Sequence, residues 1–185
     1  MSSSTSVSSE DFLPKNPNNS IKKKEKNINL ININKSISNL LTYIQKENCK
    51  KISYQKILKS QQKSIFTSKS IPLISIKDFI ERIKKYMKIE DNTLILGLIY
   101  MDRFCAKNFI TLTEYNTHRL YFISVLTALK YQEDIYYKNT FYAKICGVKV
   151  EDLNKMEYEF VVNMNFDFYV SRVLYKKYRD SLKDE

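Results

Sequence analysis

Two oppositely charged side chains stand at positions where the surrounding sequence is apolar. Glu157 lies on the apolar stripe of a predicted helix over residues 150–163, and Lys130 directly follows the apolar run of residues 120–129. The stripe consists of Leu153, Met156, Phe160, Val161 and Met164. A carboxylate on a buried face costs free energy unless a partner satisfies it. Two interpretations remain open: an internal salt bridge or helix-cap acceptor, or a groove that a partner fills, with Lys130 as the opposite charge.

The sequence contains few of the residues and motifs on which enzymatic catalysis usually depends. The chain has two glycines, so neither a GxGxxG turn nor a P-loop can be built from it. His118 is the sole histidine; it has no accompanying nucleophile or second base, and a structural role is expected for it. The adjacent Asp102 and Arg103, close to Tyr100 in the sequence, are expected to pair as an internal polar staple rather than to belong to an active site. The sequence predicts a non-catalytic binding protein with no cofactor, no metal site and no small-molecule substrate.

The net charge of +11 is concentrated near the N-terminus. Residues 1–70 carry 13 Lys and Arg against 4 Asp and Glu, whereas residues 71–185 carry 18 against 16. A nucleic-acid-binding domain usually has a basic face of its own, so the nearly neutral C-terminal part disfavours nucleic acid as a partner. Residues 1–35, rich in Ser, Asn and Lys, predict a disordered arm. Its run KKKEK at 22–26 is read as a solvated tract, with a nuclear-import signal as the alternative.

The first residues lack an apolar core, so no signal peptide is expected, and no run is long enough for a membrane span. Cys49, Cys105 and Cys146 are odd in number and widely spaced. This pattern argues against a disulfide framework and favours the nucleus or the cytoplasm.

Helical periodicity dominates the remaining chain, and no alternating strand pattern competes with it, so the predicted fold class is all-α. Residues 116–134 are apolar on nearly every side, which is typical of a central helix surrounded by others. Ser75, Asp91 or Asn92, and Asn116 are expected helix caps, and Gly147 an expected left-handed helix end. The predicted helices cover residues 36–47, 75–87, 91–106, 116–134, 139–147, 150–163 and 171–182, with an ambiguous connection over 48–70.

Five segments in this order resemble a cyclin box, and more narrowly the P/U-type cyclins related to the yeast phosphate-pathway cyclin. They are PLISIKDFIERIKKY, LIYMDRF, NTHRLYFISVLTALKY, YYKNTFYAKICGV and VEDLNKMEYEFVVNMNFDFYV. The resemblance covers about residues 36–182 and implies a single five-helix box, with its core at about 72–168. An additional N-terminal helix precedes the box and a short C-terminal helix follows it.

The resemblance implies a regulatory subunit that docks on the C-helix of a cyclin-dependent protein kinase and activates it. In cyclins, a lysine late in the third box helix and a glutamate in the fifth make much of the polar contact, and these positions match Lys130 and Glu157. The matching apolar or aromatic docking positions are Tyr131, Val161, Phe166 and Phe168.

The chain departs from other cyclins in three respects. The first box helix lacks the Met-Arg-Ala-Ile-Leu pattern that recruits substrates, the sequence after Phe168 is too short for a second box, and no destruction-box motif is present. Two alternatives stay open: a cyclin-like domain that binds DNA or the transcription machinery, and a scaffold that binds a kinase without activating it. The near-neutral charge of residues 71–185 counts against the first.

Overall fold

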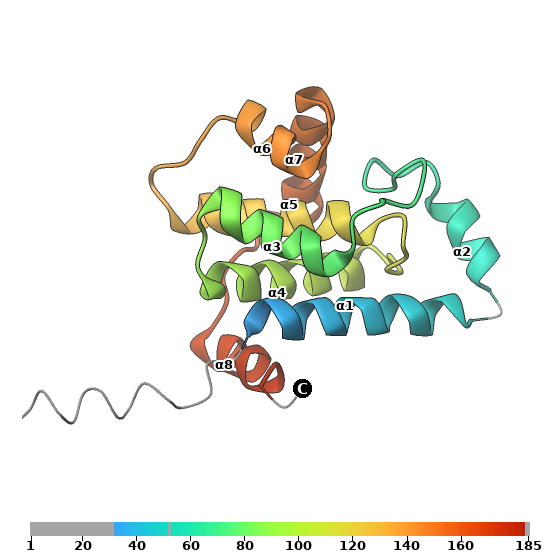
Figure 1. Ribbon diagram of the computed structural model, residues 1–185, viewed down its shortest axis with the longest axis horizontal. Helices are drawn as coiled ribbons and strands as arrows, with labels where there is room; N and C mark the ends of the chain where they lie inside the picture. Colours follow the sequence, from blue (N-terminus) through green and yellow to red (C-terminus); the bar gives the residue numbers. More distant parts are fainter. Residues whose placement is uncertain (1–31, 52, 184–185) are drawn as a thin grey trace, which may run out of the picture. The chain divides into compact units, whose positions relative to one another are not determined.

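In the computed structural model, residues 32–51 and 53–183 are described, and they form eight α-helices without a β-strand (Figure 1). The helices are α1 (Ile33–Cys49), α2 (Tyr54–Gln61), α3 (Ile76–Met87), α4 (Asp91–Lys107), α5 (Thr117–Gln132), α6 (Asn139–Cys146), α7 (Val150–Asn163) and α8 (Arg172–Ser181). The all-α prediction is confirmed. The predicted disordered arm falls almost entirely outside the described residues.

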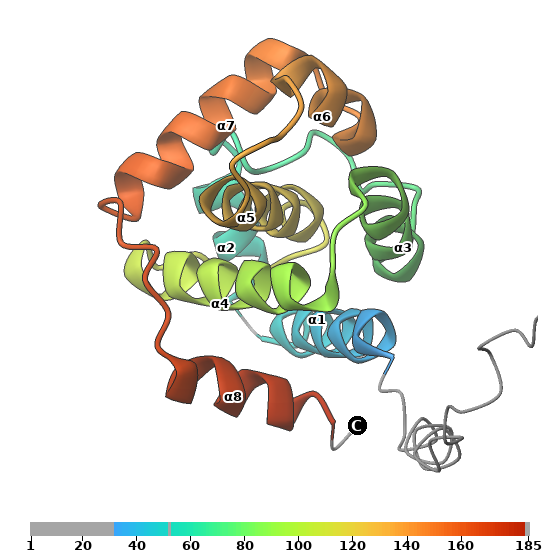
Figure 2. The same cartoon turned by 90° about the vertical axis from the view of Figure 1, so that its left-hand side faces the viewer.

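Helix α5 is the centre of the helical domain, as its apolar surface predicted. Every residue from Leu120 to Leu129 is buried, and Figure 2 shows α5 nearly end-on with α3, α4, α6 and α7 around it. Helix α4 packs closest, because Gly97 allows the two backbones to approach: a Cβ there would lie 2.4 Å from Cγ2 of Val125. Among the described residues, no helix is long and apolar enough to cross a membrane.

Two of the expected helix ends are confirmed. The Oγ of Ser75 accepts a hydrogen bond from the amide of Asp78 at 3.1 Å and caps α3. Gly147 ends α6 in the left-handed conformation, with φ of 76°, and its amide donates to the carbonyl of Ala143 at 2.9 Å. A residue without Cβ adopts this conformation at little cost.

Two other caps differ from the prediction. The N-cap residue of α4 is Glu90 rather than Asp91 or Asn92, and the Oδ1 of Asn92 accepts from the neighbouring amide of Thr93 at 2.8 Å. Asn116 does occupy the N-cap position of α5, but its Oδ1 accepts from the amide of Thr113 at 2.8 Å. Asn116 therefore orders the turn before the helix instead of capping the helix itself.

The first of the N-terminal helices packs against helices that follow it. Helix α1 begins at Ile33, three residues earlier than predicted, because Asn32 caps it and Ile33 is buried. It packs on α3 and α4, and its Gln45 and Asn48 side chains donate to the carbonyls of Thr113 and Leu112. The ambiguous connection contains one further helix, α2.

Candidate functional site

Lys130 and Glu157 meet at the surface between α5 and α7. The Lys130 Nζ donates to Glu157 Oε1 at 2.6 Å, and the two side chains are 20% and 22% exposed. Of the two interpretations left open by the sequence, the structure thus realises an internal ion pair. The pair nevertheless reaches solvent, so both charges remain accessible to a partner at this surface. Lys130 also sits in the last turn of α5, where a cation is favoured by the helix dipole.

Asn139, the first residue of α6, completes this pair as a network. Its Oδ1 accepts from Lys130 Nζ at 2.8 Å, and its Nδ2 donates to Glu157 Oε2 at 2.7 Å. The same Nδ2 lies 2.7 Å from Oδ1 of Asn154, and the Tyr136 ring lies 5.4 Å from Lys130 Nζ. The two charges are therefore held at fixed positions by an amide that sequence reasoning had treated only as a helix start.

Exposed or half-buried apolar side chains accompany the Lys130–Asn139–Glu157 network on α5, on α7 and just after α7. Tyr131 is 59% exposed and Phe166 is 71% exposed, whereas Val161 is half-buried. Two exposed residues of α7 that the sequence had not indicated, Tyr158 and Val162, lie one turn apart on the same helix face. We call Tyr131, Tyr158, Val161, Val162 and Phe166, together with the network, the α5–α7 surface.

Phe168 lies below this surface rather than on it. Its ring is buried and packs against Tyr100 at a centroid distance of 5.4 Å and against Tyr131 at 5.9 Å. The side chain predicted to face a partner thus supports Tyr131 from beneath.

Phe166 is displayed by an unusual backbone. Asn165 and Phe166 both have positive φ, 54° and 55°, immediately after α7 ends. Residues with a Cβ pay about 1–2 kcal/mol for this conformation. Strain of this kind persists only where the surroundings hold it, and it gathers at functional positions.

Arg103 and Tyr100 form a staple that holds the chain following Phe166, whereas the predicted pair between Asp102 and Arg103 does not form. Arg103 donates to the carbonyls of Asp167 and Tyr169 at 2.8 and 3.1 Å, and Tyr100 donates to the carbonyl of Phe168 at 2.7 Å. Asp102 does not pair with Arg103; it accepts from the hydroxyl of Tyr178 in α8 at 2.5 Å. Burial and this carboxylate raise the pKa of Tyr178 to about 12.

The histidine and two of the cysteines have surroundings that suit a structural role. Nε2 of His118 lies 3.0 Å from the carbonyl of Ile74, its ring packs edge-on against Phe79, and burial lowers its pKa. Burial raises the pKa of both Cys105 and Cys146 to about 12, so these thiols stay protonated at neutral pH. Within the part of the chain that the structure describes, no cluster of His, Cys, Asp or Glu could hold a metal ion.

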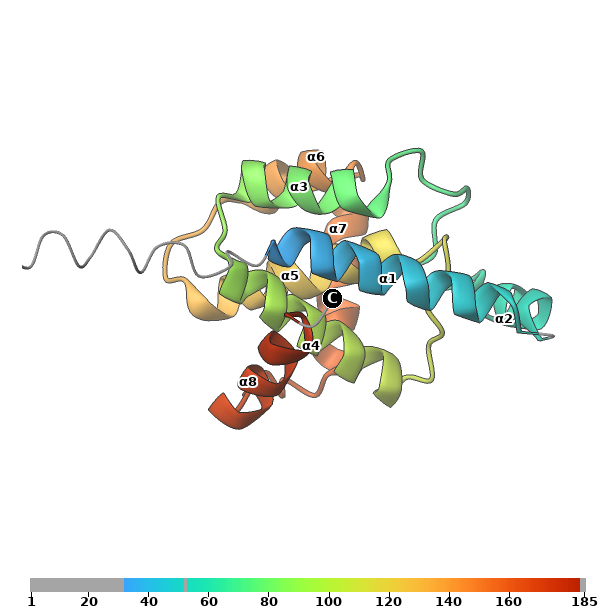
Figure 3. The same ribbon diagram turned by 60° about the horizontal axis from the view of Figure 1, so that its bottom comes forward.

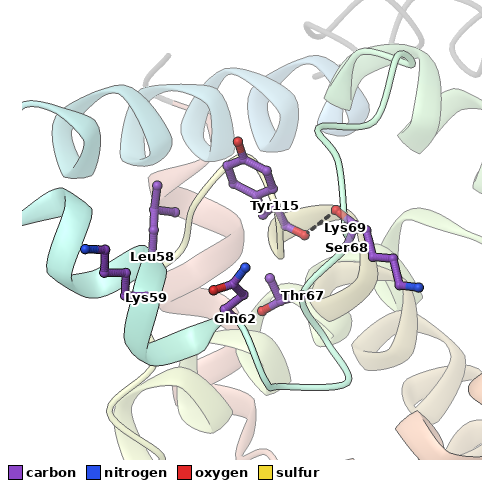
Figure 4. A pocket seen from close by; sticks show the side chains of 7 residues that line it. All are labelled: Leu58, Lys59, Gln62, Thr67, Ser68, Lys69 and Tyr115. Atoms are coloured by element: carbon purple, nitrogen blue, oxygen red, sulfur yellow. Dashed lines mark hydrogen bonds between the residues drawn. The ribbon is translucent and has the colours of Figure 1, made fainter.

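A pocket of about 530 Å³ opens beside α2, but it contains no acid–base pair. Figure 4 shows its lining, with the Ser68 hydroxyl bonded to the carbonyl of Tyr115 at 2.7 Å. The lining residues are Leu58, Lys59, Gln62, Thr67, Ser68, Lys69 and Tyr115. None of these is a carboxylate, a histidine or a cysteine, so its titratable groups are the two lysines and the tyrosine.

Comparison with known proteins identifies the family of this chain. The family model for cyclins matches residues 3–168. The chain belongs to the cyclin family. It is 37% identical over 124 residues to Cyclin-U2-1 of Arabidopsis thaliana, covering 65% of this chain and 55% of the relative. It is also 32% identical over 122 residues to Cyclin-P3-1 of Oryza sativa subsp. japonica, covering 66% and 52%.

These relatives confirm the resemblance to the P/U-type cyclins. This cyclin spans little more than half the length of either of them. Helices α3 to α7 lie at the positions predicted for the five box helices, with α1 and α2 before them and α8 after them. The α5–α7 surface is thus formed by the third and fifth box helices.

Proposed function

We propose that this cyclin is a non-catalytic regulatory subunit that binds and activates a cyclin-dependent protein kinase through the α5–α7 surface. The observation that carries the proposal is the ordered Lys130–Asn139–Glu157 network set among exposed apolar side chains. A preordered polar network loses little further conformational entropy when a partner binds. The neighbouring apolar side chains contribute to the affinity when they are covered.

The apolar part of the surface can supply substantial binding free energy. A fully buried aromatic side chain removes about 150–250 Å² from water. At about 25 cal/mol per Å², covering the exposed parts of Tyr131 and Phe166 contributes about 3 kcal/mol each. Phe168 and the staple at Arg103 keep these rings in position, which limits the ordering cost.

The cyclin would act through conformation rather than chemistry. A kinase C-helix that packs on the α5–α7 surface is stabilised in the orientation that aligns the kinase Lys–Glu pair with its Mg²⁺-binding residues. Because the cyclin would bind this conformation more tightly than the inactive one, binding shifts the kinase population toward the active state. We also propose the nucleus or the cytoplasm as the place of action, in keeping with the three free cysteines.

The test is an affinity capture from extract with the full chain as bait, followed by identification of the bound kinase and a protein-kinase assay. The variant Tyr131→Ala/Phe166→Ala removes two exposed rings of the surface. The matched control, Tyr43→Ala/Phe109→Ala, removes two rings that are 63% and 93% exposed, and Phe109 has the same positive φ as Phe166. Loss of affinity by about tenfold or more is expected for the first variant alone.

Three results would contradict the proposal. Equal loss with both variants would show that the α5–α7 surface is not the docking site. Capture of a kinase without activity would favour a scaffold. Capture of transcription factors or DNA in place of a kinase would favour the other alternative.

A further inference from the structure

We infer that α8 and the start of α4 form a second binding site, a cationic groove for an acidic peptide segment of a partner. The groove has a volume of about 480 Å³ and is lined by Asn92, Leu96, Gln132, Val170, Arg172, Tyr175, Lys176 and Arg179. We call it the α8 groove. Figure 3 shows α8 beside α4, and the groove is lined by residues of both helices. It shares no residue with the α5–α7 surface.

One face of α8 supplies the positive charge. Arg172, Lys176 and Arg179 follow one another at intervals of four and three residues, so they lie on the same side of the helix. Arg179 pairs with Asp180 at 3.2 Å. Within residues 32–51 and 53–183, neither Arg172 nor Lys176 makes an ion pair. Two cations therefore point at the groove with their charge unbalanced.

The two amides of the groove offer donors to a ligand. Asn92 Oδ1 accepts from the amide of Thr93 at 2.8 Å, and Gln132 Oε1 accepts from Thr93 Oγ1 at 3.2 Å. With both oxygens engaged by one residue, the side-chain nitrogens of Asn92 and Gln132 remain as donors. The cations also donate only, so a fitting ligand carries negatively charged acceptors. Carboxylates meet this requirement.

The remainder of the lining favours a peptide over nucleic acid. Leu96 and Val170 are half-buried and give the groove an apolar floor, next to the ring of Tyr175. An acidic peptide with an occasional apolar side chain would place its carboxylates near the cations and its apolar side chain on the apolar floor. A nucleic acid would need many more phosphate contacts than two unbalanced cations provide.

The groove is held in shape by bonds outside it. Ser171 caps α8 through the amide of Leu174, Tyr178 donates to Asp102 of α4, and Leu182 is buried. Asp91 at the start of α4 carries a further carboxylate, and its partner is Lys84. Burial raises the pKa of Tyr175, and the charge of Asp91 adds to this effect while that of Arg179 opposes it. The backbone of α8 is therefore held in place, so the helix needs no rearrangement to receive a ligand.

The test measures fluorescence anisotropy of a short labelled peptide of Asp and Glu interrupted by Leu, titrated with the full chain at low salt. Arg172→Glu/Lys176→Glu is the groove variant. Lys56→Glu/Lys177→Glu changes the net charge equally, with Lys177 on α8 but outside the groove. We expect the groove variant to raise Kd about tenfold, equivalent to about 1.4 kcal/mol, and the control to change it less than about twofold. Circular dichroism of each variant verifies that the helices are intact.

Three outcomes would overturn the inference. Failure of the wild-type chain to bind the peptide would contradict the inference. Equal weakening by the groove and control variants would assign the binding to overall charge, including that of residues 1–31. Tighter binding of a single-stranded oligonucleotide, with the same sensitivity to Arg172 and Lys176, would make the site one for nucleic acid. The kinase capture experiment is independent of all three, so either proposal can fail alone.

Discussion

The ion pair between Lys130 and Glu157 can be tested by a double-mutant cycle in the free chain. Glu157→Gln keeps the shape of the side chain but removes its charge, and Lys130→Met removes the ammonium while keeping most of the apolar stem. Exposed pairs contribute about 0.2–1 kcal/mol, whereas breaking a fully buried pair costs about 3–5 kcal/mol. The pair here is about four-fifths buried and has a third partner in Asn139.

Its position between those limits sets the expected magnitudes. Glu157→Gln should lower the free energy of unfolding by about 2 kcal/mol, and the coupling energy with Lys130→Met should be about 1–2 kcal/mol. For a domain of this size, a loss of 2 kcal/mol corresponds to a fall in Tm of about 4–8 °C. Lys130→Met alone should cost a similar amount, because it leaves the Glu157 carboxylate with the neutral amide of Asn139.

Urea denaturation followed by far-UV circular dichroism provides the measurement, with Glu159→Gln as the matched control. Glu159 lies on the same helix but is exposed, so its change should stay within about 0.5 kcal/mol. A coupling energy near zero would refute the reasoning, because it would mean that Lys130 and Glu157 do not hold each other in solution. The surface would then lack the preordered network on which its proposed affinity depends.

Substitutions at three further positions test the fold with the same denaturation measurement. Gly97→Ala should cost about 1–3 kcal/mol, because the new methyl group meets Val125 at 2.4 Å; a neutral result would show that α4 and α5 are less tightly packed. Gly147→Ala should cost about 1 kcal/mol through its φ of 76° alone, since nothing lies within 4 Å of the added Cβ; Gly147→Asn should restore part of the loss. Burial lowers the pKa of His118 below 6.5, so the unfolded chain binds the extra proton and stability falls as pH drops through 6.5. His118→Gln should flatten this dependence, and an unchanged pH profile would assign it to other groups.

The sequence predicted helices well wherever local signals agreed. Helix α7 covers Val150–Asn163, the range that the sequence predicted. Helix α6 ends before Gly147, which adopts the left-handed conformation that glycine tolerates. The cap of α4 could not be predicted in the same way. Asp91 and Asn92 are both favoured cap residues, yet the N-cap position falls on Glu90, whose side chain makes no cap hydrogen bond. Helix ends are commonly uncertain by one or two residues when they are predicted from sequence.

The sequence indicated two of the three residues of the polar network, Lys130 and Glu157, but not Asn139. A charge on an apolar stripe is visible in a sequence, which is why Lys130 and Glu157 could be named. Asn139 could not, because it lies 9 and 18 residues from its two partners and an asparagine at a helix start has an ordinary explanation. Exposure of Tyr158 depends on which neighbours cover α7, and periodicity alone does not contain that information.

The two proposed sites depend on the same helix. One side of α4 packs on α5, and its late residues Tyr100, Asp102 and Arg103 hold the segment after α7 and the helix α8. That segment begins with the left-handed Asn165 and Phe166, and α8 begins only a few residues later. Arg103 therefore restrains both the display of Phe166 on the α5–α7 surface and the approach of α8 to the groove. Because one guanidinium binds carbonyls on both sides of Phe168, loosening it would release the strained turn and the start of α8 together. The two sites would then be separable by substitutions in their own linings but coupled through Arg103.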